Sequence, residues 1–193
     1  DWSRFGLDRP PFRPAVDPDS YFPAAAHEVA LAAVAAAFAR RDPAVLIDGV
    51  AGVGKSLVAR KWLEHLLPEV PRVVLPNVRA ERPADLLQAI MFDLGEPYQG
   101  RTEHELRLAV TDRLLGAAAS GFPTVLVLDE AQHLSQPALE ELRLLGNLET
   151  RVGVAVFAVL VAQPALRDAL RRPAYELFAQ RVSARAAVEP LAP

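Results

Sequence analysis

Residues 49–56 read Gly-Val-Ala-Gly-Val-Gly-Lys-Ser, and this stretch decides the predicted fold of the chain. It fits the pattern G-x4-G-K-[ST], which forms a phosphate-binding loop when it joins a strand to a helix. The apolar run Ala44–Ile47 enters the loop, and Ser56–Leu63 leaves it with helical character. The glycines let successive N–H groups point inward, and the helix N-terminus adds the positive end of its dipole. The stretch therefore predicts a site for a nucleoside triphosphate.

The chemistry of this loop assigns a role to each of its two polar residues. Lys55 is expected to reach the β- and γ-phosphates of ATP, and the Ser56 hydroxyl is expected to hold Mg²⁺. The competing interpretation is a glycine-rich turn whose Lys-Ser pair only begins a helix. The predicted nucleotide-binding residues are Gly49, Val50, Ala51, Gly52, Val53, Gly54, Lys55, Ser56 and Leu57.

Length and composition limit what can surround the loop. The chain has 193 residues, of which 51% are hydrophobic, so it is large enough for one α/β core and too short for two full domains. It contains no cysteine, which excludes disulfides and Cys-ligated zinc. The four histidines, at positions 27, 65, 104 and 133, lack metal-ligand spacing and are expected to be surface or core residues.

Net charge and hydropathy bear on nucleic-acid binding and on the cellular location of the protein. The net charge of −3 argues against a protein that is coated in nucleic acid. No apolar run approaches the roughly 20 residues of a membrane span, and the first residues lack the features of a signal peptide. A cytoplasmic location is therefore expected, with membrane association left open through a C-terminal segment that this sequence does not contain.

The chain divides into an arm and a core. Residues 1–23 are rich in proline and aromatic side chains, which predicts an extended arm packed on the core. Its aromatic residues, Phe5, Phe12, Tyr21 and Phe22, either pack on the core or form a wall of an adenine pocket. Residues 24–193 are expected to form one nucleotide-binding domain.

Helical and apolar segments alternate through the core. Helices are expected over residues 24–41, 56–67, 83–94, 102–120, 137–149, 164–170 and 174–180, and strands over 44–48, 70–76, 124–129, 152–162 and 182–188. Thr102 and Glu105 form a predicted capping box, and Leu139, Leu142, Leu145 and Leu148 are placed on one helical face. This alternation predicts an α/β fold, a three-layer αβα P-loop NTPase with a central parallel sheet and ligands at the carboxyl ends of its strands.

Four apolar residues, 125–128, are followed by the two acids Asp129 and Glu130 at the end of the strand predicted over 124–129. Asp129 is expected to hold Mg²⁺ through water, opposite Ser56. Glu130, one residue later, is the candidate general base that orients and polarises the attacking water. The alternative is that the two acids only cap the next helix.

Polar residues end two other strands. Gln163 follows Ala155–Ala162, where its side chain is expected to touch the γ-phosphate; the alternative is a helix N-cap substitute before Pro164. Asn77 ends the strand over 70–76 and is a candidate hydrogen-bond partner of Glu130 in an inactive state.

Arginines follow the last short helix. Arg181 is the candidate arginine finger, which would reach the γ-phosphate of a neighbouring subunit. Arg185 is a second candidate, and a solvated surface arginine is the alternative for both.

With these residues in place, the chain resembles the AAA+ ATPases, and more narrowly the general secretion pathway protein A group and related ATP-binding helpers of transposition. Stretches in the order found here carry the likeness across nearly the whole chain: Phe5-Gly-Leu…Pro11-Phe12, Pro18…Tyr21-Phe22, His27, Gly49–Ser56, Leu128-Asp-Glu-Ala-Gln-His-Leu134, Leu139-Glu-Glu-Leu-Arg-Leu-Leu145 with Asn147 and Glu149, Leu160-Val-Ala-Gln-Pro-Ala-Leu166 and Gln180-Arg-Val…Arg185…Pro190-Leu191.

The resemblance implies named roles and an assembly. Gln163 would be sensor 1, Asn77 the glutamate switch and Arg181 the finger, with ATP held between subunits of a ring or filament. The family continues beyond the equivalent of Pro193 into a helical lid, so the lid is expected to be absent or truncated here.

Three functions compete. The first is a Mg²⁺-dependent ATPase whose turnover drives assembly of a protein partner complex, as in secretion. The second is an ATP-gated DNA-binding module of the transposition-helper kind, with hydrolysis as a timer. The third takes residues 129–132 as a helicase motif, for which a second nucleotide-closing domain would be needed and no sequence remains.

Overall fold

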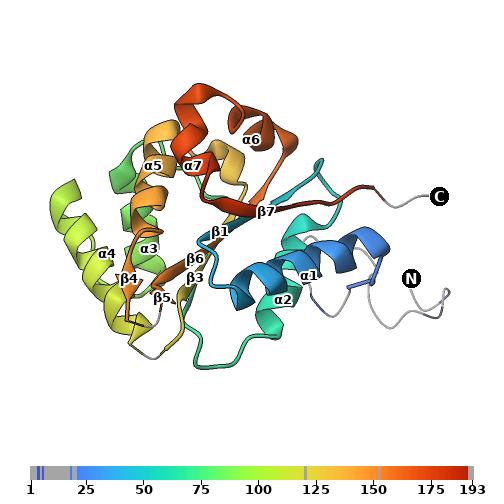
Figure 1. Cartoon of the computed structure of the whole chain (residues 1–193), viewed down its shortest axis with the longest axis horizontal. Helices are drawn as coiled ribbons and strands as arrows, with labels where there is room; N and C mark the ends of the chain where they lie inside the picture. Colours follow the sequence, from blue (N-terminus) through green and yellow to red (C-terminus); the bar gives the residue numbers. More distant parts are fainter. Residues whose placement is uncertain are drawn as a thin grey trace.

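Five short apolar segments form the central sheet of the computed structural model, which describes residues 4, 6, 18, 21–119, 121–151 and 153–190 (Figure 1). The strands lie in the order β2 (Arg72–Leu75), β3 (Thr124–Asp129), β6 (Val156–Ala162), β1 (Ala44–Asp48) and β7 (Val182–Ala187). All neighbouring pairs are parallel. The inner strands read as continuous apolar runs because helices cover both of their faces.

The alternation of side chains along each strand produces two separate cores. In β1, Val45 and Ile47 point to one face of the sheet, and Ala44 and Leu46 point to the other. The first face packs against α1 (Ala25–Ala39) and α2 (Lys55–Glu64), with Phe157 at its centre. The sheet is therefore the middle of three layers, as the sequence predicted.

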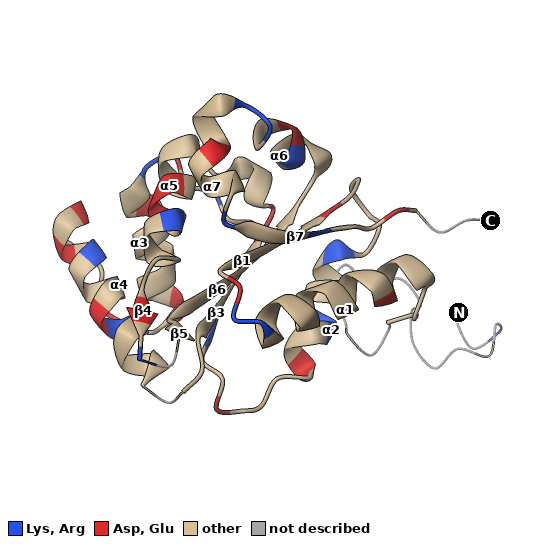
Figure 2. Ribbon diagram, viewed as in Figure 1, with Lys and Arg blue, Asp and Glu red and all other residues tan. Residues whose placement is uncertain are grey.

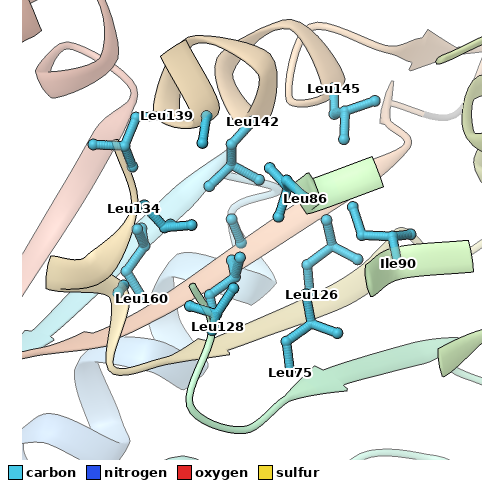
Figure 3. Packing of buried hydrophobic residues seen from close by; sticks show 14 of the residues in the cluster. Leu75, Leu86, Ile90, Leu126, Leu128, Leu134, Leu139, Leu142, Leu145 and Leu160 are labelled. Carbon is cyan, nitrogen blue, oxygen red and sulfur yellow. The ribbon is translucent and has the colours of Figure 1, made fainter. Parts of the chain in front are cut away.

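The second face carries the larger, leucine-rich core (Figure 3). It packs against α3 (Pro83–Asp93), α4 (Glu103–Ala118) and α5 (Gln136–Leu145). The short helices α6 (Pro164–Ala169) and α7 (Glu176–Ala179) close the same side through Leu166, Leu170 and Phe178. Within the described ranges between residues 21 and 190, the structure also has the 3₁₀ turns η3 (Ala131–His133) and η4 (Pro173–Tyr175). Charged residues concentrate on the helices and connecting loops (Figure 2).

Two predicted helices end earlier than expected. The helix after the loop was predicted to run to residue 67, but α2 ends at Glu64. Pro68 accounts for this, because its ring would collide with the carbonyl of residue 64 in a continued helix. The helix predicted over 137–149 is α5, which ends at Leu145, so Leu148 packs on the core from outside the helix.

The strand predicted over residues 152–162 is two elements. Glu149–Thr150 (β4) and Gly153–Val154 (β5) form a small antiparallel hairpin, and the sheet strand β6 begins only at Val156. Gly153 has φ +123°, a conformation that few other residues adopt, and it turns the chain before the strand. The uninterrupted apolar composition concealed this turn from sequence analysis.

Other local predictions hold. The capping box is present, since the Glu105 N–H donates to Thr102 Oγ1 at 3.3 Å and the Glu105 carboxylate accepts from the Thr102 N–H at 2.7 Å. Most of the arm over 1–23, including Phe5 and Phe12, lies outside the described residues, so its packing on the core stays a prediction.

The close approach of β7 to the start of the loop requires glycine at position 49. The Val188 N–H donates to the Asp48 carbonyl at 2.7 Å, and a Cβ at Gly49 would overlap the Val188 carbonyl oxygen. We expect Gly49→Ala to lower the free energy of unfolding by about 2 kcal/mol. Gly116→Ala is the matched control: it lies inside α4 with free space around it and should stabilise the chain by about 0.5–1 kcal/mol. Thermal unfolding without nucleotide measures both, and equal shifts for the two variants would contradict the overlap.

Candidate functional site

The loop of residues 49–57 joins the carboxyl end of β1 to the amino end of α2, as the motif requires. Gly52 and Gly54 have φ angles of +83° and +90°, which favour glycine. Gly54 is the N-cap residue of α2, so the helix begins with the Lys-Ser pair. The first N–H groups of α2 are therefore directed at the loop, which is the arrangement that binds phosphate.

Lys55 lies inside the loop with only 6% of its surface exposed. Its Nζ donates to the carbonyl oxygen of Val50 at 2.8 Å. Burial lowers the pKa of Lys55, and the negative charges of Glu130, Asp129 and Asp48 oppose that shift. The structure thus brings the predicted lysine and the predicted acid pair into one electrostatic environment.

His27 packs on the loop from α1. Its Nε2 lies 2.7 Å from the carbonyl oxygen of Val53, and because a carbonyl only accepts, Nε2 carries the proton. A Cβ at Gly54 would lie 2.9 Å from the same nitrogen, so glycine is needed there for a second reason. His27 is buried, and the Tyr21 ring contacts it edge-on at 6.1 Å between centroids. Sequence analysis gave His27 no role, and its only signal was its place among the family-like stretches.

Glu130 lies directly after β3 with φ +58°, a left-handed conformation that is uncommon outside glycine. Its N–H donates to Asp129 Oδ1 at 2.9 Å. Gln132 Nε2 donates to the Glu130 carboxylate, and Gln163 Nε2 lies 3.4 Å from the same oxygen. Strained residues of this kind concentrate at functional sites because the surroundings hold them there.

Gln132 completes this cluster and was missed by sequence analysis. Its side-chain oxygen accepts from the Gln163 N–H at 3.0 Å while its amide donates to Glu130. It therefore ties the end of β6 to the end of β3. The position was quoted only within a motif, because a glutamine two residues past an acid has no role that local sequence can indicate.

The side chains of Gln163 and Glu130 do not cap the helices that follow them, whereas the Asp129 carboxylate accepts from the N–H of Glu130 at the start of η3. Gln163 is the N-cap residue of α6, and its side chain makes no capping hydrogen bond. Glu130 is the N-cap residue of η3, and its carboxylate makes none either. The side chains of both residues are directed at each other instead.

Asn77 lies beside the acid pair. It follows β2 with φ +54°, and the N–H of the next residue, Val78, donates to the Asp129 carbonyl at 2.9 Å. The Asn77 side chain is exposed, and no hydrogen bond joins it to Glu130 among the described residues. Its predicted switching role stays a prediction.

The predicted Mg²⁺ ligands fit the preferences of that ion. Ser56 and Asp129 are both half-buried and supply a hydroxyl and a carboxylate, and oxygen donors are the ligands that Mg²⁺ selects. Within the described ranges no three His, Asp or Glu side chains form a metal cluster. Mg²⁺ is usually held by one or two protein oxygens plus substrate phosphates, so a two-residue site is the expected form.

Arg181 and the loop lie at opposite ends of two neighbouring strands: Arg181 precedes β7, and the loop follows β1. Arg181 is exposed and directly precedes β7, whose first residue, Val182, pairs with Ala44 at the start of β1. The loop follows the other end of β1, about 13 Å away at about 3.3 Å per residue. Arg185 pairs with Leu46 in the middle of β1 and is also exposed. The backbone of Arg181 therefore lies at the end of the strands opposite to the loop of residues 49–57.

Comparison with known proteins gives one family and one close sequence relative. The AAA domain family matches residues 39–170. General secretion pathway protein A of Aeromonas hydrophila is 37% identical over 190 residues, which is 97% of this chain and 34% of that protein. The chain thus spans about a third of the length of this relative. In the part of the chain that the structure describes, no helix is long and apolar enough to cross a membrane.

Solved structures share the fold at low sequence identity. The Aeropyrum pernix ORC2 protein, in complexes with ADPNP and ADP, superposes with a TM-score of 0.67 at 18% identity, over 90% of this chain and 50% of that one. Cdc6p of Pyrobaculum aerophilum gives a TM-score of 0.64 at 17% identity, over 96% and 49%. At these identities the likeness concerns the fold alone.

Proposed function

Because this chain belongs to the AAA domain family, we propose that it binds ATP with Mg²⁺ at residues 49–57 and hydrolyses it to ADP and phosphate. One observation carries the proposal. The phosphate-loop lysine, Lys55, lies in the electrostatic field of Asp129 and Glu130, which come from the end of a different strand. A cation for phosphate, a carboxylate for Mg²⁺ and a carboxylate for water are the parts that phosphoryl transfer requires.

Each part has a defined task in this proposal. Lys55 neutralises the β- and γ-phosphates, and the N–H groups at the start of α2 bind the same oxygens. Ser56 and Asp129 would hold Mg²⁺, which supplies the positive charge that stabilises the transferring phosphoryl group. Glu130 accepts the proton of the attacking water and directs its lone pair at phosphorus.

In this proposal, Gln132 and Gln163 hold the general base, Glu130, in position. Gln132 and Gln163 bind the Glu130 carboxylate and hold it at the end of β3. When ATP is present, the γ-phosphate is a stronger acceptor for the Gln163 amide than the shared carboxylate oxygen. Gln163 would then leave Glu130 free to orient water, which is a sensor role.

Arg181 acts on a neighbouring subunit in this proposal. Arg181 lies at the amino ends of the strands, whereas the loop of its own chain lies at their carboxyl ends. A contact with a γ-phosphate would therefore involve another copy of the chain. Each active site would then be shared between two subunits of a ring or filament.

Secretion is the proposed setting, since the relative with 37% identity is General secretion pathway protein A. We propose that ATP turnover drives assembly of a partner complex of that pathway. ATP-gated DNA binding, the competing hypothesis, predicts a complex with DNA that forms only with ATP and weakens steeply with salt. Measuring the size of the assembly with ATP, without ATP and with a DNA duplex at low salt separates the two.

Replacing Lys55 tests the binding step. Lys55→Ala should weaken ATP binding about a hundredfold, because the charge-assisted contacts to two phosphates are lost. Lys61→Ala is the matched control, since Lys61 is the other lysine of the chain and forms a surface pair with Glu64 two turns along α2. Calorimetric titration with ATP and Mg²⁺ measures both. Equal affinities for the two variants would refute the phosphate role of Lys55.

A further inference from the structure

An ion pair between a buried carboxylate and a partly exposed guanidinium joins the start of the phosphate loop to α6. Asp48 is the last residue of β1, directly precedes Gly49 and is only 2% exposed. Its Oδ2 lies 3.0 Å from a terminal guanidinium nitrogen of Arg167, whose side chain is 36% exposed. Neither residue belongs to the phosphate-loop motif, and β1 and α6 are more than a hundred residues apart in sequence.

Asp48 places a negative charge where it opposes the function of the site. It is one of three carboxylates that raise the pKa of Lys55, so its field reaches the nitrogen that would bind the polyphosphate. A buried carboxylate with no counter-charge repels an incoming anion more strongly than an exposed one, because water screens it less. Arg167 is placed to neutralise this charge.

Arg167 is connected to Gln163 through α6. Both residues belong to the same short segment: Gln163 is the N-cap of α6, and Arg167 lies one turn later. At one end of this segment, Gln163 contacts Glu130 and Gln132. At the other end, Arg167 contacts Asp48. The segment around α6 is thus held between the acid pair of β3 and the beginning of the phosphate loop.

The contact depends on charge rather than on a directed hydrogen bond. Asp48 Oδ2 and Arg167 Nε make no hydrogen bond with any described residue, although the two side chains approach within 3.0 Å. Asp168, the other acid near Arg167, is exposed and lies 3.6 Å from Nε. Asp48 is therefore the buried partner that fixes the guanidinium, and the pair can hold α6 without fixing one exact orientation.

We propose that Arg167 is a positioning residue of the ATPase site, which neutralises Asp48 beside the phosphate loop and holds α6 so that Gln163 reaches the γ-phosphate. The inference rests on the proposed ATPase function and adds to it a residue outside the loop and the acid pair. It assigns two separable effects to one side chain: an electrostatic effect on ATP affinity and a geometric effect on turnover.

Removing one charge at a time separates these effects. Arg167→Met keeps most of the side-chain length and leaves Asp48 unpaired, so the Kd for ATP should rise about tenfold. Asp48→Asn leaves Arg167 without its counter-charge near the phosphates, so the Kd should stay unchanged or fall. The double variant should regain a Kd close to that of the unaltered chain. Turnover at saturating ATP should fall in all three variants, because α6 is no longer tied to the loop.

A purely structural pair would behave differently, since both single variants would then weaken ATP binding together with thermal stability. Arg167→Lys, which keeps the charge, should restore ATP affinity. Arg171→Met is the control, because Arg171 is exposed and pairs only on the surface with Asp168. Kd shifts of the same sign in Arg167→Met and Asp48→Asn, or an Arg167→Met variant with unaltered Kd and turnover, would overturn the inference. If the unaltered chain itself failed to bind ATP, the proposed function would fail instead, so the two failures are distinguishable.

Discussion

Glu130→Gln should bind ATP as tightly as the unaltered chain and hydrolyse it about 10²- to 10⁴-fold more slowly. Glutamine keeps the shape of the side chain and can still bond with Gln132 and Gln163, so the loop and the β3 end are undisturbed. It has no basic oxygen that can accept the proton of water, so only the chemical step is affected. Phosphate release under saturating ATP, together with a separate Kd measurement, checks both parts of this prediction.

Glu140→Gln serves as the control for this experiment. Glu140 lies on α5, which packs on the face of the sheet opposite to α2, and forms a half-buried pair with Arg143 within the same helix. Its removal should change neither binding nor turnover. If Glu130→Gln hydrolysed ATP at the unaltered rate, Glu130 could not be the general base, and the cluster around it would have to serve another purpose.

Arg181→Ala should lower turnover in the assembled state by about 10³-fold while leaving the ATP affinity of each chain unchanged. The reason is the separation of Arg181 from its own loop along β1, so the proposed finger role requires the loop of a neighbouring chain. The clearest test measures the ATPase activity of a mixture of two inactive variants, Arg181→Ala and Lys55→Ala. Arg181→Ala supplies an intact loop, Lys55→Ala supplies an intact finger, and the mixture should regain activity that neither variant has alone.

The same mixture distinguishes Arg181 from Arg185. Arg185 lies on the exposed edge strand opposite Leu46, and its alanine variant should complement Lys55→Ala only if Arg185 is the finger. The specific activity of the unaltered chain should also rise with chain concentration, because a shared site forms only on association. Activity that is independent of concentration, with no gain on mixing, would place the complete active site within one chain.

Local sequence was sufficient for most of the fold. The strands β1 and β3 have the predicted bounds, and α1, α3 and α4 agree with prediction to within two residues at each end. The bounds of these elements follow from local features of the sequence. These features are the apolar runs, the capping box at Thr102, and the glycine or proline residues at the ends of the elements. Errors remain at the Gly153 turn inside an apolar run and at the end of α5, where local signals were silent, and at the end of α2, where Pro68 stops the helix earlier than predicted.

The candidate site also has a part that local sequence predicted and a part that only the fold shows. The positions of the loop and of the acid pair were predictable from local sequence. Each follows an apolar run that forms a strand, so the backbone geometry of the neighbouring residues is enough to place it at the carboxyl end of that strand. The structure adds that Lys55 lies in the field of Asp129 and Glu130 and that Gln163 contacts Glu130, which parallel strands ending at one edge make possible.

For this protein, the sequence alone determined the loop at residues 49–56, the parallel sheet and the acids that end β3. Only the tertiary structure decided that His27 contacts the loop at Val53, that Gln132 joins Glu130 to Gln163, and that Arg167 pairs with Asp48. A motif is a property of neighbouring residues, and local backbone geometry is enough to place it. A charge pair between β1 and α6 depends on the strand order, the register and the packing of a helix on the sheet, and these are set by the folding of the whole chain.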